Sequence, residues 1–195
     1  MITFELLTEK NFQLNALDTY DRRQEVKKVY RKKDGEYLLV DCPYTEDWDL
    51  EKKRGVAKSI SSDEYISFLA LDGRNVVGFI SLLKNLKKEY MILDLMQVSN
   101  SYRGNGIGRT LFDLGKEEAK KAGAKALYIS ACSSEETIAF YRAMGAEITD
   151  CPIKEIAEEE PYDLQMICPL NKKIGMSDEG VIIKNESKKN RWYVT

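Results

Sequence analysis

The segment from Tyr102 to Thr110 reads Tyr-Arg-Gly-Asn-Gly-Ile-Gly-Arg-Thr, and its residue types and spacing suit phosphate binding. It lies between an apolar run and an amphipathic pattern, which predicts a turn that opens a helix. The first amides of a helix lack partners within it and carry partial positive charge, so they bind anions. Glycines allow close approach of the main chain to phosphate oxygens, and Arg103 and Arg109 add positive charge. The pattern predicts a pyrophosphate or ribose phosphate site, although a tight strand-to-helix connection would have the same composition.

The spacing of the glycines separates three kinds of nucleotide site. A dinucleotide fold requires Gly-x-Gly-x-x-Gly, and counting from Gly104 places Arg109 where the third glycine should be. An NTP-binding P-loop requires Gly-x-x-x-x-Gly-Lys-Ser/Thr, but Gly108 is followed by Arg109 and the position five residues earlier is Arg103. Neither pattern fits, which leaves Arg-x-x-Gly-x-Gly from Arg103 to Gly108.

This loop resembles the acyl-CoA pyrophosphate loop of the GNAT N-acetyltransferase superfamily. Residues 134–146 resemble that superfamily's later helix, which commonly ends in Tyr, three residues and Gly, and residues 163–166 are a weaker match to its final strand. The resemblance implies a mixed α/β (α+β) GNAT fold with a central, mostly antiparallel sheet of about seven strands flanked by helices. A splayed central strand of that sheet would bind acyl-CoA.

The resemblance also implies an acyl-CoA-dependent N-acyltransferase, more narrowly an N-acetyltransferase. It would move an acetyl group from the co-substrate acetyl-CoA, without a metal, to a primary amine of a small molecule or peptide by direct attack on the thioester. One alternative is a non-catalytic acyl-CoA-binding sensor or interaction module with the same fold. A further alternative is acylation of an alcohol or transfer of a longer acyl chain. The sequence does not identify the acceptor, because acceptor pockets are built from variable loops.

Individual roles follow from the same resemblance. The pantetheine arm of the coenzyme would pair with main chain near Met96 and Val98, and the Val98 amide would polarise the thioester carbonyl, an interaction worth about 3 kcal/mol elsewhere. Tyr141 falls where the superfamily often has a tyrosine that protonates the departing thiolate, although it could also be an aromatic packed on the sheet. The other coenzyme-binding candidates are Arg103, Gly104, Asn105, Gly106, Ile107, Gly108, Arg109, Ser134 and Thr137.

An amine must lose a proton to attack, and the chain contains no histidine to accept it. Glu89 and Asp94 on the expected central strand are candidate bases, with water as the alternative, although strand carboxylates are often solvated or ion-paired. The acidic run at 155–160 either attracts a cationic amine or is a solvated surface. Tyr44 and Trp48 either line the acceptor pocket or belong to the core.

Hydrophobic patterns predict the elements that position these residues. An apolar run at 89–98 predicts a central strand, and helical spacing at 110–122 predicts a helix that ends at Gly123. Next we expect a strand at 126–131, a helix at 134–144, the start of a strand at 146–149 and a last strand at 162–168. The N-terminal half predicts a strand at 1–7, helices at 8–20 and 21–33, an extended piece at 36–41, a loop at 42–48, a helix from Asp47 or Asp49 through Ser59, and a hairpin of 65–71 and 76–83.

The composition limits the class of protein. The 195 residues predict a single domain at 1–170 and a polar extension at 171–195. A net charge of -2 argues against nucleic acid as a partner, and the apolar residues never form the run of about 20 that a membrane helix needs. The N-terminus lacks the pattern of a signal peptide, and the four cysteines form no Cys-x-x-Cys pair. We therefore expect a cytoplasmic protein with free thiols that uses no membrane and could form a homodimer.

Overall fold

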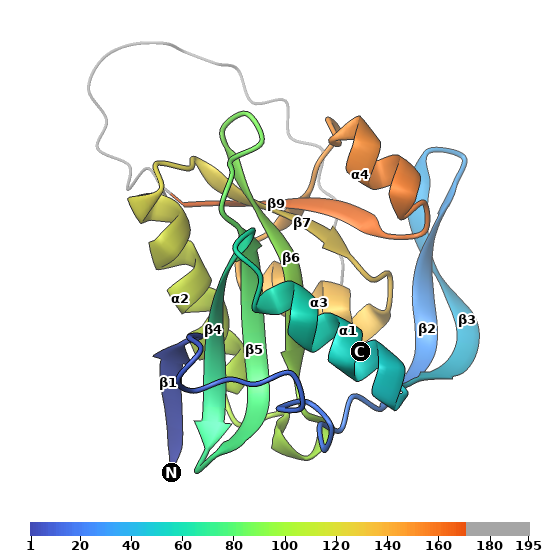
Figure 1. Cartoon of the computed structure of the whole chain (residues 1–195). Coiled ribbons are helices and arrows are strands. Elements are labelled where there is room, and N and C mark those ends of the chain that lie inside the picture. Colours follow the sequence, from blue (N-terminus) through green and yellow to red (C-terminus); the bar gives the residue numbers. More distant parts are fainter. Residues whose placement is uncertain (171–195) are drawn as a thin grey trace.

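The computed structural model describes residues 1–170, and the expected C-terminal extension at 171–195 lies outside the described residues. The central sheet has seven strands in the order β1-β4-β5-β6-β7-β9-β8, and β2 pairs with β3 in a separate hairpin (Figure 1). Within these residues the neighbouring strands of the sheet are antiparallel, except that β6 and β7 run parallel. The predicted mixed α/β fold with a mostly antiparallel sheet is confirmed. The strands are β1 (Ile2–Leu6), β2 (Gln24–Lys33), β3 (Glu36–Glu46), β4 (Tyr65–Asp72), β5 (Asn75–Leu83), β6 (Tyr90–Val98), β7 (Ala126–Ala131), β8 (Glu147–Ile148) and β9 (Leu164–Pro169).

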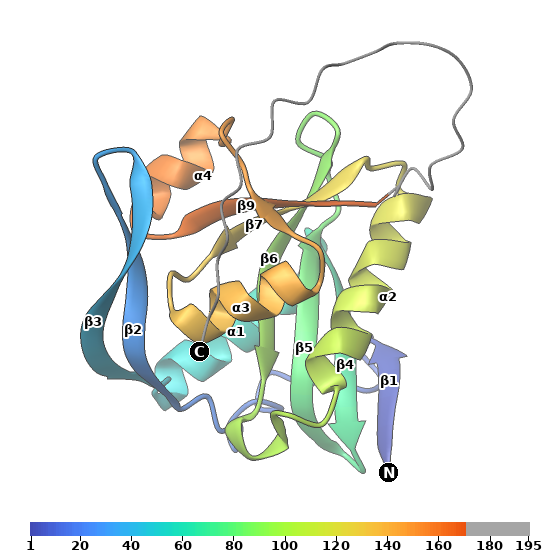
Figure 2. The ribbon, with the colours of Figure 1, turned by 180° about the vertical axis from the view of Figure 1, so that it is seen from behind.

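Helices cover both faces of the sheet. Helix α1 (Leu50–Ile60) lies on one face, whereas α2 (Ile107–Lys121) and α3 (Glu135–Ala143) lie on the other, as the two opposite views show (Figures 1 and 2). The fully buried Phe79 belongs to the core under α1, and Ile80, the next residue, belongs to the core under α2 and α3. Alternate residues of β5 therefore fill opposite cores, which explains why this strand reads as a continuous apolar run.

The region around the phosphate-binding motif folds largely as the hydrophobic pattern predicts. The predicted helices become α2 and α3, and Gly123 follows α2 with a φ of 79°. The strands predicted at 89–98, 126–131 and 162–168 become β6, β7 and β9. Helix α4 (Lys154–Glu159) lies in the acidic run, where no helix was predicted. No helix in residues 1–170 has the length and apolarity that crossing a bilayer would require.

The N-terminal half differs from the prediction in three places. The predicted helix at 8–20 is wrong, because these residues form successive turns that bury Phe12, Leu17 and Tyr20. The predicted helix at 21–33 is also wrong, because this segment contains β2. The register of β2 against β3 shifts between Val26 and Lys28, so a bulge places Val26 and Val29 on one side at a spacing that imitates a helix. Strand β3 runs through Glu46, so most of the predicted loop at 42–48 is strand.

Two further predictions in this half are confirmed. Asp49 caps α1, because its carboxylate Oδ1 accepts a hydrogen bond of 2.7 Å from the Lys52 amide. Strands β4 and β5 form the expected antiparallel hairpin, and Asp72 pairs with Asn75 at its tip. This hairpin places β5 beside β6, the strand on which the candidate site is built.

Candidate active site

Strands β6 and β7 pair over only part of their length. The parallel pairing runs from Tyr90 opposite Ala126 to Leu93 opposite Ile129, whereas β6 continues to Val98. Divergence begins at a bulge: Leu93 pairs with Leu82 and Leu95 with Ser81, so Asp94 has no partner on β5. The second half of β6, residues 94–98, therefore has an edge without a strand partner inside the sheet, which we call the open edge.

The main-chain groups of Met96 and Val98 face this open edge. Val98 pairs with Gly78, while the amide of the next residue, Ser99, donates to the Val77 carbonyl at 2.9 Å. Residues of an antiparallel pair alternate between positions that exchange hydrogen bonds and positions that do not. The bonds to β5 thus belong to Gln97 and Ser99, and the N–H and C=O groups of Met96 and Val98 point the other way. An extended ligand could pair with them as a strand would.

The glycine-rich turn follows directly after β6. Gly104 and Gly106 have φ values of 78° and 79°, a left-handed conformation that glycine adopts without steric cost. Gly106 precedes α2 without a side-chain cap, which leaves the first amides of the helix free of an intrahelical partner. Gly108 lies where a Cβ atom would be 3.3 Å from Phe140 Cε2, so the two helices approach closely. The turn presents the uncapped helix N-terminus that the sequence predicts.

The two arginines of the motif have different surroundings. The Arg103 side chain turns back toward β6, and its Nε donates to the Val98 carbonyl at 3.0 Å while Nη2 donates to the Arg22 carbonyl at 3.4 Å. Burial, and then the nearby charge of Arg22, lowers the pKa of Arg103. Arg109 is exposed on the first turn of α2. A cavity of about 430 Å³ adjoins the turn, lined by Arg23, Gln24, Glu25, Asn100, Arg103 and Glu136.

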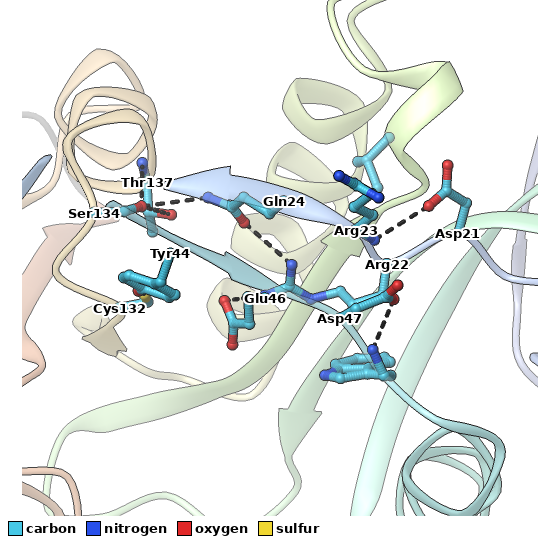
Figure 3. A network of polar contacts seen from close by, with 12 residues as sticks. Asp21, Arg22, Arg23, Gln24, Tyr44, Glu46, Asp47, Cys132, Ser134 and Thr137 are labelled. Atoms are coloured by element: carbon cyan, nitrogen blue, oxygen red, sulfur yellow. Dashed lines mark hydrogen bonds and ion pairs between the residues drawn. The ribbon is translucent and has the colours of Figure 1, made fainter. Parts of the chain in front are cut away.

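The predicted Ser134 and Thr137 lie at the start of α3. The Ser134 hydroxyl accepts a hydrogen bond from the Thr137 amide at 3.3 Å and donates to the Thr137 hydroxyl at 2.8 Å. Ser134 is fully buried and also accepts from Gln24 Nε2 at 3.4 Å (Figure 3). These contacts begin the helix and join it to the β2–β3 hairpin. A direct part for either hydroxyl in coenzyme binding stays a prediction.

Tyr141 lies two turns further along α3. Its ring is 7% exposed and packs against Phe112 and Phe140, with ring centroids 5.9 Å and 5.3 Å away. Burial, and then the charges of Cys132 and Asp163, raises the pKa of its hydroxyl. Among the described residues, no side-chain hydrogen bond engages that hydroxyl. A protonated O–H group without a side-chain partner can donate a proton to a ligand.

The β2–β3 hairpin crosses the end of β7. The Tyr30 amide donates to the Ser133 carbonyl at 2.8 Å, and Val29 forms a β-bridge with Ser134. The Tyr44 hydroxyl lies 3.9 Å from Cys132 Sγ, just beyond the last residue of β7. Trp48 packs against the core under α1. Both predicted aromatics thus come from the hairpin and the segment that follows it, although only Tyr44 lies beside β7.

Three carboxylates near β6 and β7 differ in how well they are placed to accept the proton of the amine. Glu89 lies at the closed, paired end of β6 and forms an ion pair of 2.6 Å with Lys125, so the structure separates it from the open edge. Asp94 lies at the bulge and accepts a hydrogen bond of 3.0 Å from the Tyr65 hydroxyl. Burial, with a contribution from Glu160, raises the pKa of Asp94 against the opposing effect of that hydrogen bond.

Asp163 is a third carboxylate, which the sequence did not suggest as a base. Because Leu164 pairs with Ala131, Asp163 lies beside Cys132 at the end of β7. Burial, and then the charges of Glu160 and Glu46, raises the pKa of Asp163 to about 6, whereas Arg31 lowers it. Asp94 therefore lies on β6 where the splay begins, whereas Asp163 directly precedes β9, beside the end of β7, and each carries a carboxyl group with a raised pKa.

Comparison with known proteins assigns the family. The model of the acetyltransferase (GNAT) family matches residues 25–146, which include the β2–β3 hairpin, β6, the glycine-rich turn and α3. The chain belongs to the GNAT acetyltransferase family. It is thus an acyl-CoA-dependent acetyltransferase, and the resemblance of its two sequence motifs to this family is confirmed. No curated protein sequence is significantly similar to the chain.

Solved structures share the GNAT fold at low identity. A nourseothricin acetyltransferase is 19% identical with a TM-score of 0.67, and the match covers 87% of this chain and 99% of the other. A putative streptothricin acetyltransferase from Bacillus anthracis str. Ames, in complex with acetyl coenzyme A, is 19% identical with a TM-score of 0.66 and coverages of 87% and 98%. The ribosomal-protein-S18-alanine N-acetyltransferase from Escherichia coli is 17% identical with a TM-score of 0.55 and coverages of 94% and 100%.

The GNAT motifs led to the turn, to β6 and to α3, but several side chains near them were missed. Arg22 and Gln24 lie in a segment interpreted as a helix, so their side chains had no predicted place in the site. Asp163 was seen only as part of a weak strand match. One usable signal existed for Asp163: a carboxylate directly before an apolar strand often lies at the edge of a sheet, where clefts form.

Proposed function

We propose that the protein is an N-acetyltransferase that moves an acetyl group from acetyl-CoA to a primary amine of a small molecule or peptide. The open edge of β6, next to an uncapped helix N-terminus, is the observation that carries this proposal. A pantetheine arm contains two amide groups, so it can pair with the outward-facing main chain of Met96 and Val98. Its pyrophosphate would then reach the turn that begins α2.

The glycine-rich turn holds the phosphates in this proposal. The amides of Ile107, Gly108 and Arg109 point into the turn, and the exposed Arg109 side chain adds positive charge. Gly104, Asn105 and Gly106 shape the loop so that the main chain can approach the oxygens. Arg103 does not contact the phosphates in this proposal and supports the site indirectly, by its hydrogen bond to the Val98 carbonyl.

The Val98 amide would stabilise the reaction's developing negative charge. The amine nitrogen attacks the thioester carbon, and the carbonyl oxygen becomes an oxyanion that accepts a hydrogen bond from the Val98 N–H. The C–S bond then breaks, and the CoA thiolate takes a proton from the Tyr141 hydroxyl. The raised pKa of that hydroxyl keeps it protonated until the thiolate forms. Direct attack needs no covalent acyl-enzyme, and Cys132 has no histidine to activate it.

A carboxylate at the splay would take the proton from the acceptor's ammonium group, so that the neutral amine can attack the thioester. Asp163 suits this role best, because a pKa of about 6 leaves it ionised at neutral pH yet more basic than an ordinary carboxylate. Asp94, on the other side of the splay, is the second candidate, and its hydrogen bond from Tyr65 makes it a weaker base. Glu89 is not proposed, since it lies at the closed end of β6.

The names of the similar solved structures bear on the nature of the acceptor. The solved structures with this fold are named as acetyltransferases of nourseothricin, of streptothricin and of an alanine of a ribosomal protein. Those names cover both small molecules and polypeptides, which supports an amine acceptor of either kind. A non-catalytic acyl-CoA sensor is the alternative function.

An amine panel with acetyl-CoA tests the proposal. Free thiol released from acetyl-CoA is followed by a colorimetric reagent in the presence of amino acids, diamines, aminoglycosides and peptides. We expect thiol release that requires both substrates, together with an acetylated amine detected by mass spectrometry. Saturable acetyl-CoA binding in calorimetry with no thiol release over the whole panel would instead support the sensor.

A further inference from the structure

A chain of partly buried polar contacts joins the β2–β3 hairpin to α3 (Figure 3). Arg22 Nη1 donates to Gln24 Oε1 at 3.2 Å, and Gln24 Nε2 donates to the Ser134 hydroxyl at 3.4 Å. That hydroxyl caps α3 through Thr137. The start of α3 is therefore connected to Arg22, which precedes β2, through the side chains of Gln24 and Ser134.

A second set of contacts joins the same residue to the end of β6. The Arg22 carbonyl accepts from Arg103 Nη2 at 3.4 Å, and Arg103 Nε donates to the Val98 carbonyl at 3.0 Å. The neighbouring carbonyl of Asp21 accepts from the Asn100 amide at 2.9 Å. Arg22 is thus connected both to Ser134 at the start of α3 and to Val98 at the end of β6. The Val98 amide is the group that would polarise the thioester.

Arg22 is held in place from within its own segment as well. Its Nη2 forms an ion pair of 2.8 Å with Glu46, and its guanidinium lies 5.4 Å from the centroid of the Trp48 ring. The residue is only 4% exposed. Its Nε nevertheless has no hydrogen-bond partner among the described residues, and neither does the buried hydroxyl of Tyr20. A buried N–H without a partner weakens folding, so this donor adds nothing to the stability that the ion pair with Glu46 provides.

We infer that Arg22 is a positioning residue for acetyl transfer, which holds the hairpin across the splay and thereby fixes the Val98 peptide beside the thioester. This inference rests on the proposed function and concerns the same site. The physical reason is the sensitivity of catalysis to geometry, since a displacement of about 1 Å in a reacting group can cost about 100-fold in rate. In the proposed complex the phosphates bind at the turn, with which the Arg22 side chain forms no hydrogen bond among the described residues. Loss of its side chain should slow the reaction and spare the coenzyme's affinity.

The same geometry gives Arg103 a different role from the one expected of it. As a phosphate ligand, Arg103 would govern the affinity for any fragment that carries the pyrophosphate. As the link between Val98 and Arg22, it governs the rate instead. An adenosine diphosphate fragment of the coenzyme, which lacks the pantetheine arm, separates these roles in a binding experiment.

The test uses the full chain with Arg22→Gln, Arg22→Lys and a matched control, Arg54→Gln. Arg54 pairs with Asp18 at 2.8 Å, the same length as the Arg22–Glu46 pair, but on the exposed side of α1. For Arg22→Gln we expect kcat to fall about 10- to 100-fold, with the Kd for CoA by calorimetry within about twofold of the wild-type value. Arg22→Lys keeps a charge beside Glu46 and should recover part of kcat. Arg54→Gln should leave both quantities unchanged.

A second variant keeps the inference testable if Arg22→Gln does not fold. Gln24→Leu leaves the Arg22–Glu46 ion pair intact and removes the hydrogen bonds of Gln24 to Arg22 and Ser134, so it should lower kcat in the same direction with a folded protein by thermal melting. For Arg103→Gln, the Kd of the adenosine diphosphate fragment should stay within about twofold while kcat falls.

The outcomes separate this inference from the proposed function. Thiol release by the wild-type protein with unchanged kcat in Arg22→Gln and Gln24→Leu would overturn the inference alone. The same holds if the loss of kcat is matched by an equal loss of affinity for CoA. Absence of thiol release in the wild-type protein would overturn the proposed function as well.

Discussion

The two halves of β6 contrast within a single strand. Residues 90–93 are paired with β7, Leu93 is paired with β5 as well, and Met91, Ile92 and Leu93 are buried. Residues 95–98 are paired with β5 alone, Asp94 has no partner on β5, and the side chains of residues 94–98 are half-buried or exposed. A single bulge at Asp94 divides the halves. One strand therefore serves the core at one end and the candidate site at the other.

The difference shows how a sheet can bind a ligand without a deep pocket. Paired main-chain groups have satisfied their hydrogen bonds and contribute to stability, whereas unpaired groups remain available to a partner. An unpaired edge in the middle of a sheet costs stability, so other segments must cover it. Here the β2–β3 hairpin crosses the end of β7 and α3 lies behind it. Substitutions on the two sides of Asp94 should consequently affect different properties.

The largest effect is expected for Leu93→Ala, in the paired half. Leu93 is 3% exposed, so its truncation should lower the free energy of unfolding by about 3 kcal/mol through lost burial and a cavity. Leu95→Ala, in the open half, is the control and should cost about 1 kcal/mol, since Leu95 is only partly buried. Urea denaturation measures both values. Equal losses would contradict the division of β6 at the bulge.

Val98→Pro should show the opposite pattern. Proline removes the N–H that faces the open edge, and no bond to β5 is lost, so kcat should fall about 100- to 1,000-fold while the fold persists. Gln97→Pro removes a bond to β5 and should instead destabilise the protein. Steady-state kinetics and thermal melting separate the two variants. A Val98→Pro protein with normal kcat would exclude the Val98 amide as the donor to the thioester oxygen.

The contrast also explains what could be predicted from the sequence. The turn, β6, α2 and α3 were predictable because their signals are local: glycines at positive φ, helical spacing and a serine cap. The splay was implied by the family resemblance, not by any feature of the strand itself. Asp94 gives no sign in the sequence that it lies at a bulge.

The contacts that complete the site are non-local, which is why they were not predicted. Gln24 and Ser134 are 110 positions apart in the sequence, and their contact depends on the hairpin crossing the end of β7. The bulge between Val26 and Lys28 also gave the apolar residues of β2 a helix-like spacing, so Arg22 and Gln24 were placed on the wrong element. Periodicity reports which side of an element is buried, but a bulge changes the period without changing the element.

Tyr141→Phe tests the proposed proton donor on α3. Because its hydroxyl has no hydrogen-bond partner among the described residues, its removal should leave the thermal midpoint nearly unchanged. The rate should fall about 100-fold at most, the lower range for loss of a general acid. The loss should be smaller with a thioester whose thiol is more acidic than CoA, since that thiolate departs without protonation. Equal losses with both thioesters would argue that Tyr141 acts only by packing.

The smallest effect is expected for Asp163→Asn, which should change both the free energy of unfolding and the activity. The pKa of Asp163 in the folded state, about 6, is above its ordinary value of 3.8, so the folded protein binds this proton more tightly than the unfolded chain. Ionisation therefore costs stability, and the cost grows as the pH rises from about 4 to about 6. Asparagine removes that cost, which should raise the free energy of unfolding by about 1 kcal/mol at pH 7.5, after allowance for solvent screening, and by little at pH 4. The same variant should lose activity if Asp163 is the base, and the acid limb of the kcat/KM profile near pH 6 should disappear. A stabilised variant that keeps this limb would transfer the role to Asp94 or water.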